Sequence, residues 1–202
     1  MADLTTPERH ASVTSSQNRQ RLVEAALALF EQRGYHGTSI GDVAEQADLA
    51  KGHVSYYFAT KAELLEYVTT ERTRQLLDQL NAALPPGSTP RAELQVFLDV
   101  TMARASELAR VGCPVGTLSS ELGKDDHALQ PYASAVLDAI QTWLHARFAA
   151  LEREPQATEH AEHLLALMQG AAVLAHAARD PTVVVRIAST ARDWLYLTVG
   201  RD

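Results

Sequence analysis

Cysteine is almost missing from this sequence: the 202 residues include one, Cys113. A single cysteine cannot form an intrachain disulfide, which excludes a small secreted scaffold held together by disulfides. No apolar run approaches the roughly 20 residues that a membrane-spanning helix needs. The N-terminal stretch MADLTTPERHASVTSS is polar and lacks the apolar centre of a signal peptide. We therefore expect a cytoplasmic protein that does not enter a membrane.

Basic residues are also in short supply. The chain has 18 Lys and Arg against 25 Asp and Glu, which gives a net charge of −7. Residues 1–65 hold six Lys or Arg and eight Asp or Glu, so this segment sums to −2. This balance argues against a protein that coats nucleic acid regardless of sequence. A local basic surface remains compatible with it, because steering depends on where the charges lie.

Strand-like alternation of apolar and polar residues is absent, and no repeat of 20 to 50 residues recurs. Helical spacing is present instead: Leu22, Ala25, Ala26, Leu29 and Phe30 form one apolar stripe. Glycine, proline and capping residues separate the helical stretches. The sequence therefore predicts an all-α fold of about nine helices, after a polar arm of about 15 residues. The predicted ranges are 16–33, 40–47, 50–57, 61–83, 89–110, 117–122, 128–153, 158–178 and 182–199.

The second and third of these helices are short and are separated by a tight turn at residues 47–49, which is the spacing of a helix-turn-helix. In that motif the second helix enters the major groove of DNA. Gly52 has no side chain to collide with a duplex, Lys51 supplies charge, and His53 can hydrogen-bond a base edge. The hydroxyls of Tyr56 and Tyr57 can reach phosphate oxygens.

Two further candidate DNA contacts flank these helices. Lys61 begins the fourth helix, where the helix dipole and the free N–H groups already favour an anion. Thr38 precedes the second helix, which either Thr38 or Ser39 caps. Thr60 and Glu63 match a capping box for the fourth helix, and Phe58 and Leu64 are expected in the core.

The stretch NRQRLVEAALALFEQRGYHGTSIGDVAEQADLAKGHVSYYFATKAELL resembles the N-terminal domain of the TetR family of bacterial transcriptional regulators. Three positions depart from that pattern. Asp48 replaces the usual turn glycine but tolerates the left-handed conformation. Ala50 replaces a Ser or Thr cap, which is worth about 1 kcal/mol, and Ser55 stands where many members have tyrosine.

The resemblance implies a division of labour along the chain. Residues 16–62 would form the DNA-binding domain, and residues 63–202 the effector-binding and dimerisation domain. The protein would be a dimeric repressor that a small-molecule effector releases from a palindromic operator, with the last two helices joining the two subunits. Bound effector would tilt the fourth helix and change the separation of the two DNA-binding heads.

The effector pocket would lie between the fourth to seventh helices. A motif of one family branch resembles GCPVGTLSSEL, residues 112–122, and places Cys113 beside this pocket. Pockets that bind small molecules are usually lined by apolar side chains and a few polar groups. The candidate lining residues are Phe97, Met102, Cys113, Trp143, Met168 and His176.

Two features of the sequence support alternative functions: the single cysteine, Cys113, and the acidic N-terminal segment. An all-α enzyme would pair Cys113 with a histidine as a nucleophile, and an electrophile or redox sensor would use the thiol itself. A protein-interaction module would be a helix-turn-helix that no longer binds DNA. His160 and His163 would need a third ligand to hold a metal; a solvated helix face is the simpler interpretation, and we expect neither a metal nor a cofactor.

Overall fold

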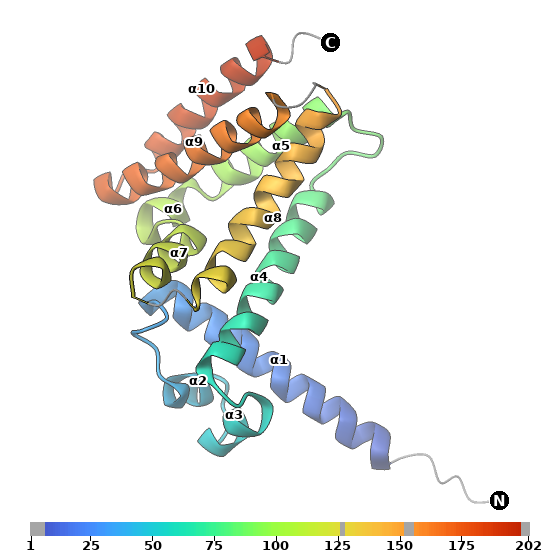
Figure 1. Ribbon diagram of the computed structural model, residues 1–202, viewed down its shortest axis with the longest axis vertical. Coiled ribbons are helices and arrows are strands. Elements are labelled where there is room, and N and C mark those ends of the chain that lie inside the picture. The colour runs from blue at the N-terminus through green and yellow to red at the C-terminus, as the bar shows by residue number, and fades with distance from the viewer. Residues whose placement is uncertain (1–6, 126–127, 152–155, 199–202) are drawn as a thin grey trace, which may run out of the picture.

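The computed structural model describes residues 7–125, 128–151 and 156–198, and these residues form ten α-helices and no strand. The prediction of an all-α protein is therefore confirmed (Figure 1). The helices are α1 Pro7–Arg33, α2 Ile40–Gln46, α3 Lys51–Tyr57, α4 Lys61–Ala82, α5 Pro90–Ala103, α6 Ala105–Val111, α7 Pro114–Asp125, α8 Gln130–Ala149, α9 Gln156–Ala178 and α10 Thr182–Thr198.

Local capping explains how the first four helices are joined. Gly34 ends α1 with a positive φ of 76°, a conformation that glycine adopts without strain. Ser39 caps α2: its hydroxyl accepts a hydrogen bond from the N–H of Asp42, and the Asp42 carboxylate accepts one from the N–H of Ser39. Asp48 has a φ of 52° in the turn before α3, so the prediction of a left-handed aspartate is confirmed. The fourth helix begins with Thr60, whose hydroxyl accepts from the N–H of Glu63.

Helices α1, α2 and α3 share their core with the beginning of α4. The predicted stripe of α1 is buried, and so are Val43 of α2 and Val54 of α3. Leu64 and Leu65 of α4 are fully buried in the same cluster. Leu122 of α7 also belongs to it, so this core continues into the larger, C-terminal part of the molecule. We use the term reading head for residues 16–62, the part that presents α2 and α3.

The C-terminal part surrounds a second core, formed by α4, α5, α8, α9 and α10. Helix α9 packs against α6, α8 and α10, and α4 packs against α8 (Figure 1). Figure 1 shows α9 and α10 side by side at the end of the molecule opposite to α2 and α3. Within the described ranges, no helix combines the length and the apolar character that a bilayer crossing requires.

Several helix boundaries differ from the predictions. Helix α1 begins at Pro7 rather than Ser16, so part of the predicted polar arm is helical. The predicted helix over 89–110 is two helices, because the chain leaves helical geometry at Arg104. Helix α7 begins at Pro114 rather than Thr117, with proline in its first turn, where a missing N–H costs nothing.

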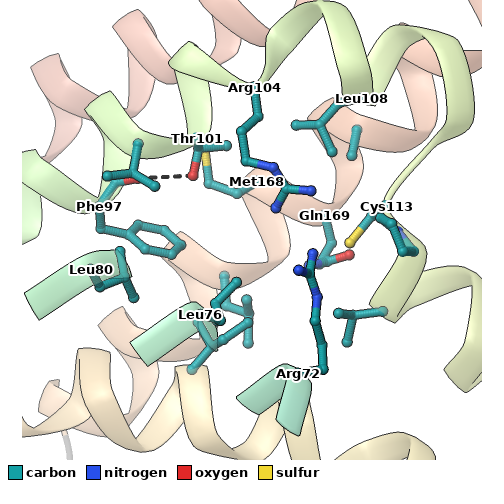
Figure 2. Close-up of a pocket in the computed structure, with 16 residues that line it drawn as sticks. Arg72, Leu76, Leu80, Phe97, Thr101, Arg104, Leu108, Cys113, Met168 and Gln169 are labelled. Atoms are coloured by element: carbon teal, nitrogen blue, oxygen red, sulfur yellow. Dashed lines mark hydrogen bonds between the residues drawn. The ribbon is translucent and has the colours of Figure 1, made fainter. Parts of the chain in front are cut away.

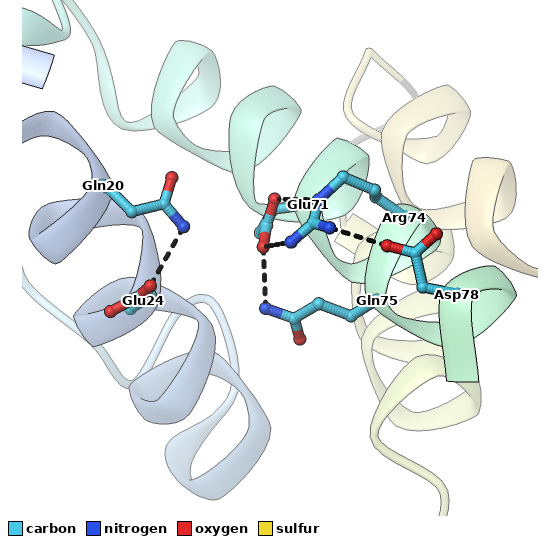
Figure 3. A network of polar contacts seen from close by, with 6 residues as sticks. All are labelled: Gln20, Glu24, Glu71, Arg74, Gln75 and Asp78. Atoms are coloured by element: carbon cyan, nitrogen blue, oxygen red, sulfur yellow. Dashed lines mark hydrogen bonds and ion pairs between the residues drawn. The ribbon is translucent and has the colours of Figure 1, made fainter. Parts of the chain in front are cut away.

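The exposed face of α4 carries a polar network (Figure 3). Arg74 forms two hydrogen bonds to Glu71 and one to Asp78, and Gln75 donates a further one to Glu71. The hydrogen bond from Arg74 lowers the pKa of Glu71. Spacings of three and four residues place these side chains on one helix face, where such pairs add modestly to helix stability. Arg74 and Asp78 are exposed, whereas the side chain of Glu71 is only 13% exposed and also interacts with Gln20 of α1, so the network lies at the edge of the contact between α1 and α4.

Candidate functional site

Helix α3 presents the most exposed side chains of the reading head. Lys51, Gly52 and His53 are all exposed, and Tyr56 is 77% exposed although it is a large aromatic residue. A Cβ added at Gly52 would meet no atom within 4 Å, so the surface around it is open. Buried Val54 fixes the helix from the other side. The arrangement leaves one face of α3 free to approach another molecule closely.

The two other predicted contacts of this region are less accessible. Tyr57 is half-buried and packs against the core of the head, while its ring lies edge-on to Tyr56 at 4.9 Å between centroids. Thr38 is 2% exposed, and its hydroxyl donates a hydrogen bond to the carbonyl of Gly34 at 2.9 Å. The side chain of Thr38 therefore closes the turn after α1, and we leave it out of the proposed DNA-binding surface.

Lys61 lies at the N-terminus of α4, beside the turn between α1 and α2. Its ammonium group donates a hydrogen bond to the carbonyl of Tyr35 and lies 4.1 Å from the centre of the Tyr35 ring. Burial lowers the pKa of Lys61, and the nearby carboxylates of Glu121 and Asp42 oppose this shift. The positive charge of Lys61 therefore lies at the edge of the reading head, where its ammonium group contacts Tyr35.

Glu121 of α7 joins the C-terminal part to the reading head. Its carboxylate accepts hydrogen bonds from the N–H of Tyr35 at 3.0 Å and from the N–H of His36 at 2.7 Å. A Cβ at Gly34 would lie 2.5 Å from a carboxylate oxygen of Glu121, so glycine also makes room for this contact. Glu121 was not among the predicted site residues, although it belongs to the stretch 112–122.

Glu121→Ala is expected to loosen the turn between α1 and α2, because two backbone N–H groups lose a charged acceptor. We expect the amides of Tyr35 and His36 to exchange with solvent at least about 10-fold faster, given that hydrogen bonds to charged groups contribute roughly 1.5–3 kcal/mol. Hydrogen exchange followed by mass spectrometry measures this. Ser120→Ala, at the exposed neighbouring position, is the control. Equal amide exchange rates in wild type and Glu121→Ala would mean that the hydrogen bonds of Glu121 do not restrain the turn.

A cavity of about 70 Å³ lies inside the C-terminal part (Figure 2). Helices α4, α5, α8 and α9 and the chain from Arg104 to Val115 surround it. Its walls are mostly apolar and include Leu76, Leu80 and Phe97. The inner face of α4 reaches it through Arg72, Leu76 and Leu80, which are spaced by four residues.

Three of the six predicted pocket residues line this cavity, namely Phe97, Cys113 and Met168. The other three lie elsewhere. Met102 packs in the neighbouring core, and Trp143 is buried behind Phe97 with its N–H donated to Asn81. His176 lines an outer groove along α7 and α9, where its Nδ1 lies 3.4 Å from the carbonyl oxygen of Ala109.

Cys113 borders both the internal cavity and the outer groove, and it is half-buried. His176 lines the same groove, but its Nδ1 faces the Ala109 carbonyl rather than the thiol. His160 and His163 pack against Trp194, with ring centroids at 5.5 and 4.6 Å. In the ranges that the structure covers, no three His, Cys, Asp or Glu side chains gather in a group that could hold a metal ion.

One wall of the cavity faces the reading head. Arg72, Pro114 and Val115 line the cavity and also a smaller one of about 20 Å³, which lies against Leu27, Phe30 and Glu31 of α1. The Arg72 guanidinium forms an ion pair with Glu31, with 3.1 Å between Nε and Oε1. Arg72, Pro114 and Val115 therefore connect the wall of the larger cavity to the side chains of α1.

The outer surface of α9 and α10 is unusually apolar. Val173 is 64% exposed and Leu174 is 56% exposed on α9, and Leu197 is 81% exposed on α10. Gly170 lies at the same surface, and a Cβ added to it would meet nothing within 4 Å. Ala171, Ala172 and Ala175 face the protomer core instead, as does Leu195. Exposed apolar patches of this kind mark interaction surfaces.

An exposed helix-turn-helix, joined to a helical body that holds a cavity, is the arrangement expected of a DNA-binding transcriptional regulator. Comparison with known proteins agrees. The sequence model "Bacterial regulatory proteins, tetR family" matches residues 22–68, and "Transcriptional regulator LmrA/YxaF-like, C-terminal domain" matches residues 90–190. The chain belongs to the tetR family of bacterial transcriptional regulators, and the expectation from the sequence is confirmed.

Individual relatives match over most of their length. The HTH-type transcriptional regulator LmrA of Bacillus subtilis is 26% identical over 184 residues, which are 88% of this chain and 96% of LmrA. The HTH-type transcriptional repressor KstR of Rhodococcus jostii is 25% identical over 176 residues, 76% of this chain and 82% of KstR. The crystal structure of a TetR transcriptional regulator from Chloroflexus aurantiacus has the same fold, with a TM-score of 0.79 at 23% identity over 93% of this chain and 97% of that one.

Proposed function

We propose that this regulator is a dimeric repressor that binds a palindromic operator and leaves it when a small molecule fills the internal cavity. The exposed face of α3 carries this proposal. Lys51, His53 and Tyr56 project from it, and open space surrounds Gly52. In this proposal His53 contacts a base edge, while Lys51, Tyr56, Tyr57 and Lys61 contact the DNA backbone.

Dimerisation through α9 and α10 would bring the two heads to one side of a duplex. Helices α9 and α10, which carry the exposed Leu174 and Leu197, lie at the end opposite to α3, so pairing through them leaves both heads free (Figure 1). Two-fold symmetric pairing matches a palindrome whose half-sites lie about 34–36 Å apart. The functional boundary then falls near residue 62, between a reading head of residues 16–62 and an effector and dimerisation part of residues 63–202.

Release would work through the wall that the cavity shares with α1. A bound molecule would press on Arg72 of α4 and on Pro114 and Val115 of α7. Helix α4 leads directly into the head, and α7 holds the head through Glu121. An effector favours release only if it binds the released arrangement more tightly than the DNA-bound one.

The decisive experiment is selection of genomic DNA fragments by the purified full chain. The proposal expects enrichment of one palindromic sequence, and transcription from the promoter that contains it should rise when the gene for this protein is deleted. The relative KstR is named a transcriptional repressor, which supports repression rather than activation by this protein. Fragments without a shared palindrome would overturn the proposal.

Lys61→Ala is expected to weaken binding to operator and to unrelated DNA by about the same factor, because a phosphate contact carries no sequence information. One lost contact per head should lower the slope of log K against log salt by about 0.9, hence roughly 2 for the dimer. Fluorescence anisotropy at several salt concentrations measures the slope. Arg110→Ala, at an exposed position of α6, is the control. A slope that Lys61→Ala leaves unchanged would place Lys61 outside the interface.

A further inference from the structure

The polar groups of the internal cavity are not evenly distributed. Figure 2 shows the guanidinium groups of Arg72 and Arg104 turned toward the same region as Gln169 and Cys113, whereas Leu80 and Phe97 line the other side. No acidic side chain lines this cavity in the described part of the chain. The cavity thus has a cationic side and an apolar side.

The two arginines come from different parts of the fold. Arg72 lies on α4, which leads into the reading head, and Arg104 lies where α5 and α6 meet. Each forms an ion pair with one carboxylate: Oε1 of Glu31 is 3.1 Å from Nε of Arg72, and Glu107 accepts a hydrogen bond from Nε of Arg104 at 3.0 Å. Arg104 also attracts Glu31, and Arg72 also attracts Glu107. Guanidinium groups offer five donors, so both keep terminal N–H groups for a further acceptor.

The ion pair of Arg72 and Glu31 lacks the hydrogen bond that Arg104 makes with Glu107. Nε of Arg72 and Oε1 of Glu31 are both buried, yet neither makes a hydrogen bond with any described residue. Burial raises the pKa of Glu31 above its usual value, against the attraction of Arg72 and Arg104. A buried guanidinium with an unused donor is poorly satisfied and favours a better-aligned anion.

We propose that the effector is an amphipathic carboxylic acid whose carboxylate is bound by Arg72 and Arg104 and whose apolar body lies against Leu76, Leu80 and Phe97. Its entry requires the cavity of about 70 Å³ to widen, because ligand pockets usually hold several hundred Å³. Carboxylates match the planar fork of a guanidinium better than other acceptors do. The ligand carboxylate competes with Glu31 for Arg72. Binding therefore weakens an ion pair between α4 and α1, which links ligand chemistry to the head.

This inference rests on the proposed release by a small molecule, but it is tested by binding to the full chain without DNA. Isothermal titration calorimetry at pH 7.5 compares octanoate, 1-octanol and octylamine, and then 4-phenylbutyrate and 4-phenyl-1-butanol. Charge-assisted hydrogen bonds predict that the carboxylate of each set binds at least about 10-fold more tightly than the alcohol. Equal affinities for acid and alcohol in both sets, or no binding by either acid, would overturn the inference.

Variants separate a ligand contact from a general loss of structure. Arg104→Gln and Arg72→Gln should each reduce the preference for octanoate over 1-octanol to less than about 3-fold, while Arg104→Lys keeps part of it. Arg186→Gln, at an exposed arginine of α10 that does not line the cavity, should leave it unchanged. Glu31→Gln should bind octanoate more tightly than wild type, because Arg72 loses its competitor. Weaker binding in Glu31→Gln, or an intact preference in Arg104→Gln, would contradict the assignment.

The same purified proteins allow the proposed function to be tested separately from the ligand class. Selection of operator fragments without ligand tests DNA binding, and addition of octanoate to the complex tests release. If the carboxylate preference holds but no operator is found, the cavity assignment stands and the regulatory proposal fails. If an operator is found but the acids bind no better than the alcohols, the regulatory proposal stands and the ligand class is wrong.

Discussion

Leu174→Asp is expected to turn the protein into a monomer and to weaken operator binding by at least about 100-fold. Leu174 is 56% exposed on α9, within the apolar surface that we propose as the dimer contact. Symmetry places the change on both subunits, and each aspartate would lose its hydration without gaining a partner. Separated heads also lose the high effective concentration that the dimer gives the second head, a factor of about 10²–10⁴.

Sedimentation velocity measures the oligomeric state, and fluorescence anisotropy measures affinity for the operator. Ala146→Asp is the matched control, because it places the same charge at an exposed alanine of α8, outside α9 and α10. The control should remain dimeric and bind as wild type does. A Leu174→Asp protein that stays dimeric at low micromolar concentration would show that the subunits meet elsewhere.

His53→Ala is expected to change which DNA sequence is preferred rather than only how tightly DNA is bound. His53 is exposed on the free face of α3, and its imidazole can donate to or accept from a base edge. Loss of one good base contact reduces discrimination by about 1–3 kcal/mol per half-site at the contacted base pair. The other positions of the half-site should keep their preferences.

Selection from a randomised operator library, sequenced after binding, measures this change. Lys61→Ala gives the contrast, since it should lower the affinity without altering the selected sequence. Identical selected sequences for wild type and His53→Ala would remove His53 from base recognition. In that case Lys51 and Tyr56, the other exposed side chains of α3, become the candidates for it.

The reading head could be predicted closely because short-range rules determine it. Gly34 and Asp48 adopt the left-handed conformations that the sequence required, and Ser39 and Thr60 cap the helices that follow them. The capping hydrogen bonds of Ser39 and Thr60 each join residues only three positions apart. The prediction that Ala50 would not cap α3 with its side chain is also confirmed.

The cavity was harder to predict, because helical spacing identifies an inward face but not the places where inward side chains leave space. Phe97 and Trp143 have similar sequence patterns, yet Phe97 borders the cavity while Trp143 packs behind it. Arg72 and Arg104 were missed because charged residues are usually assigned to the surface. For Arg72 a signal existed: it precedes Leu76 and Leu80 at spacings of four on the same face of α4.

The division of α5 from α6 at Arg104 carried no glycine or proline, so no local rule marked it. Tertiary packing decides this break, which turns α6 toward α9. The contact between Glu121 and the turn at Tyr35 joins residues more than 80 positions apart, and only the assembled fold reveals such a pair.

The shared core of the head limits how this protein can be recombined with its relatives. Leu64 and Leu65 of α4 and Leu122 of α7 fill the interior of the module that holds α3. A chimera joined after residue 62 would transplant α1 to α3 but leave their inner surface facing foreign side chains. Engineers who wish to give these heads a new sensor would have to graft the matching faces of α4 and α7 as well, so the natural unit of exchange is larger than the conventional motif.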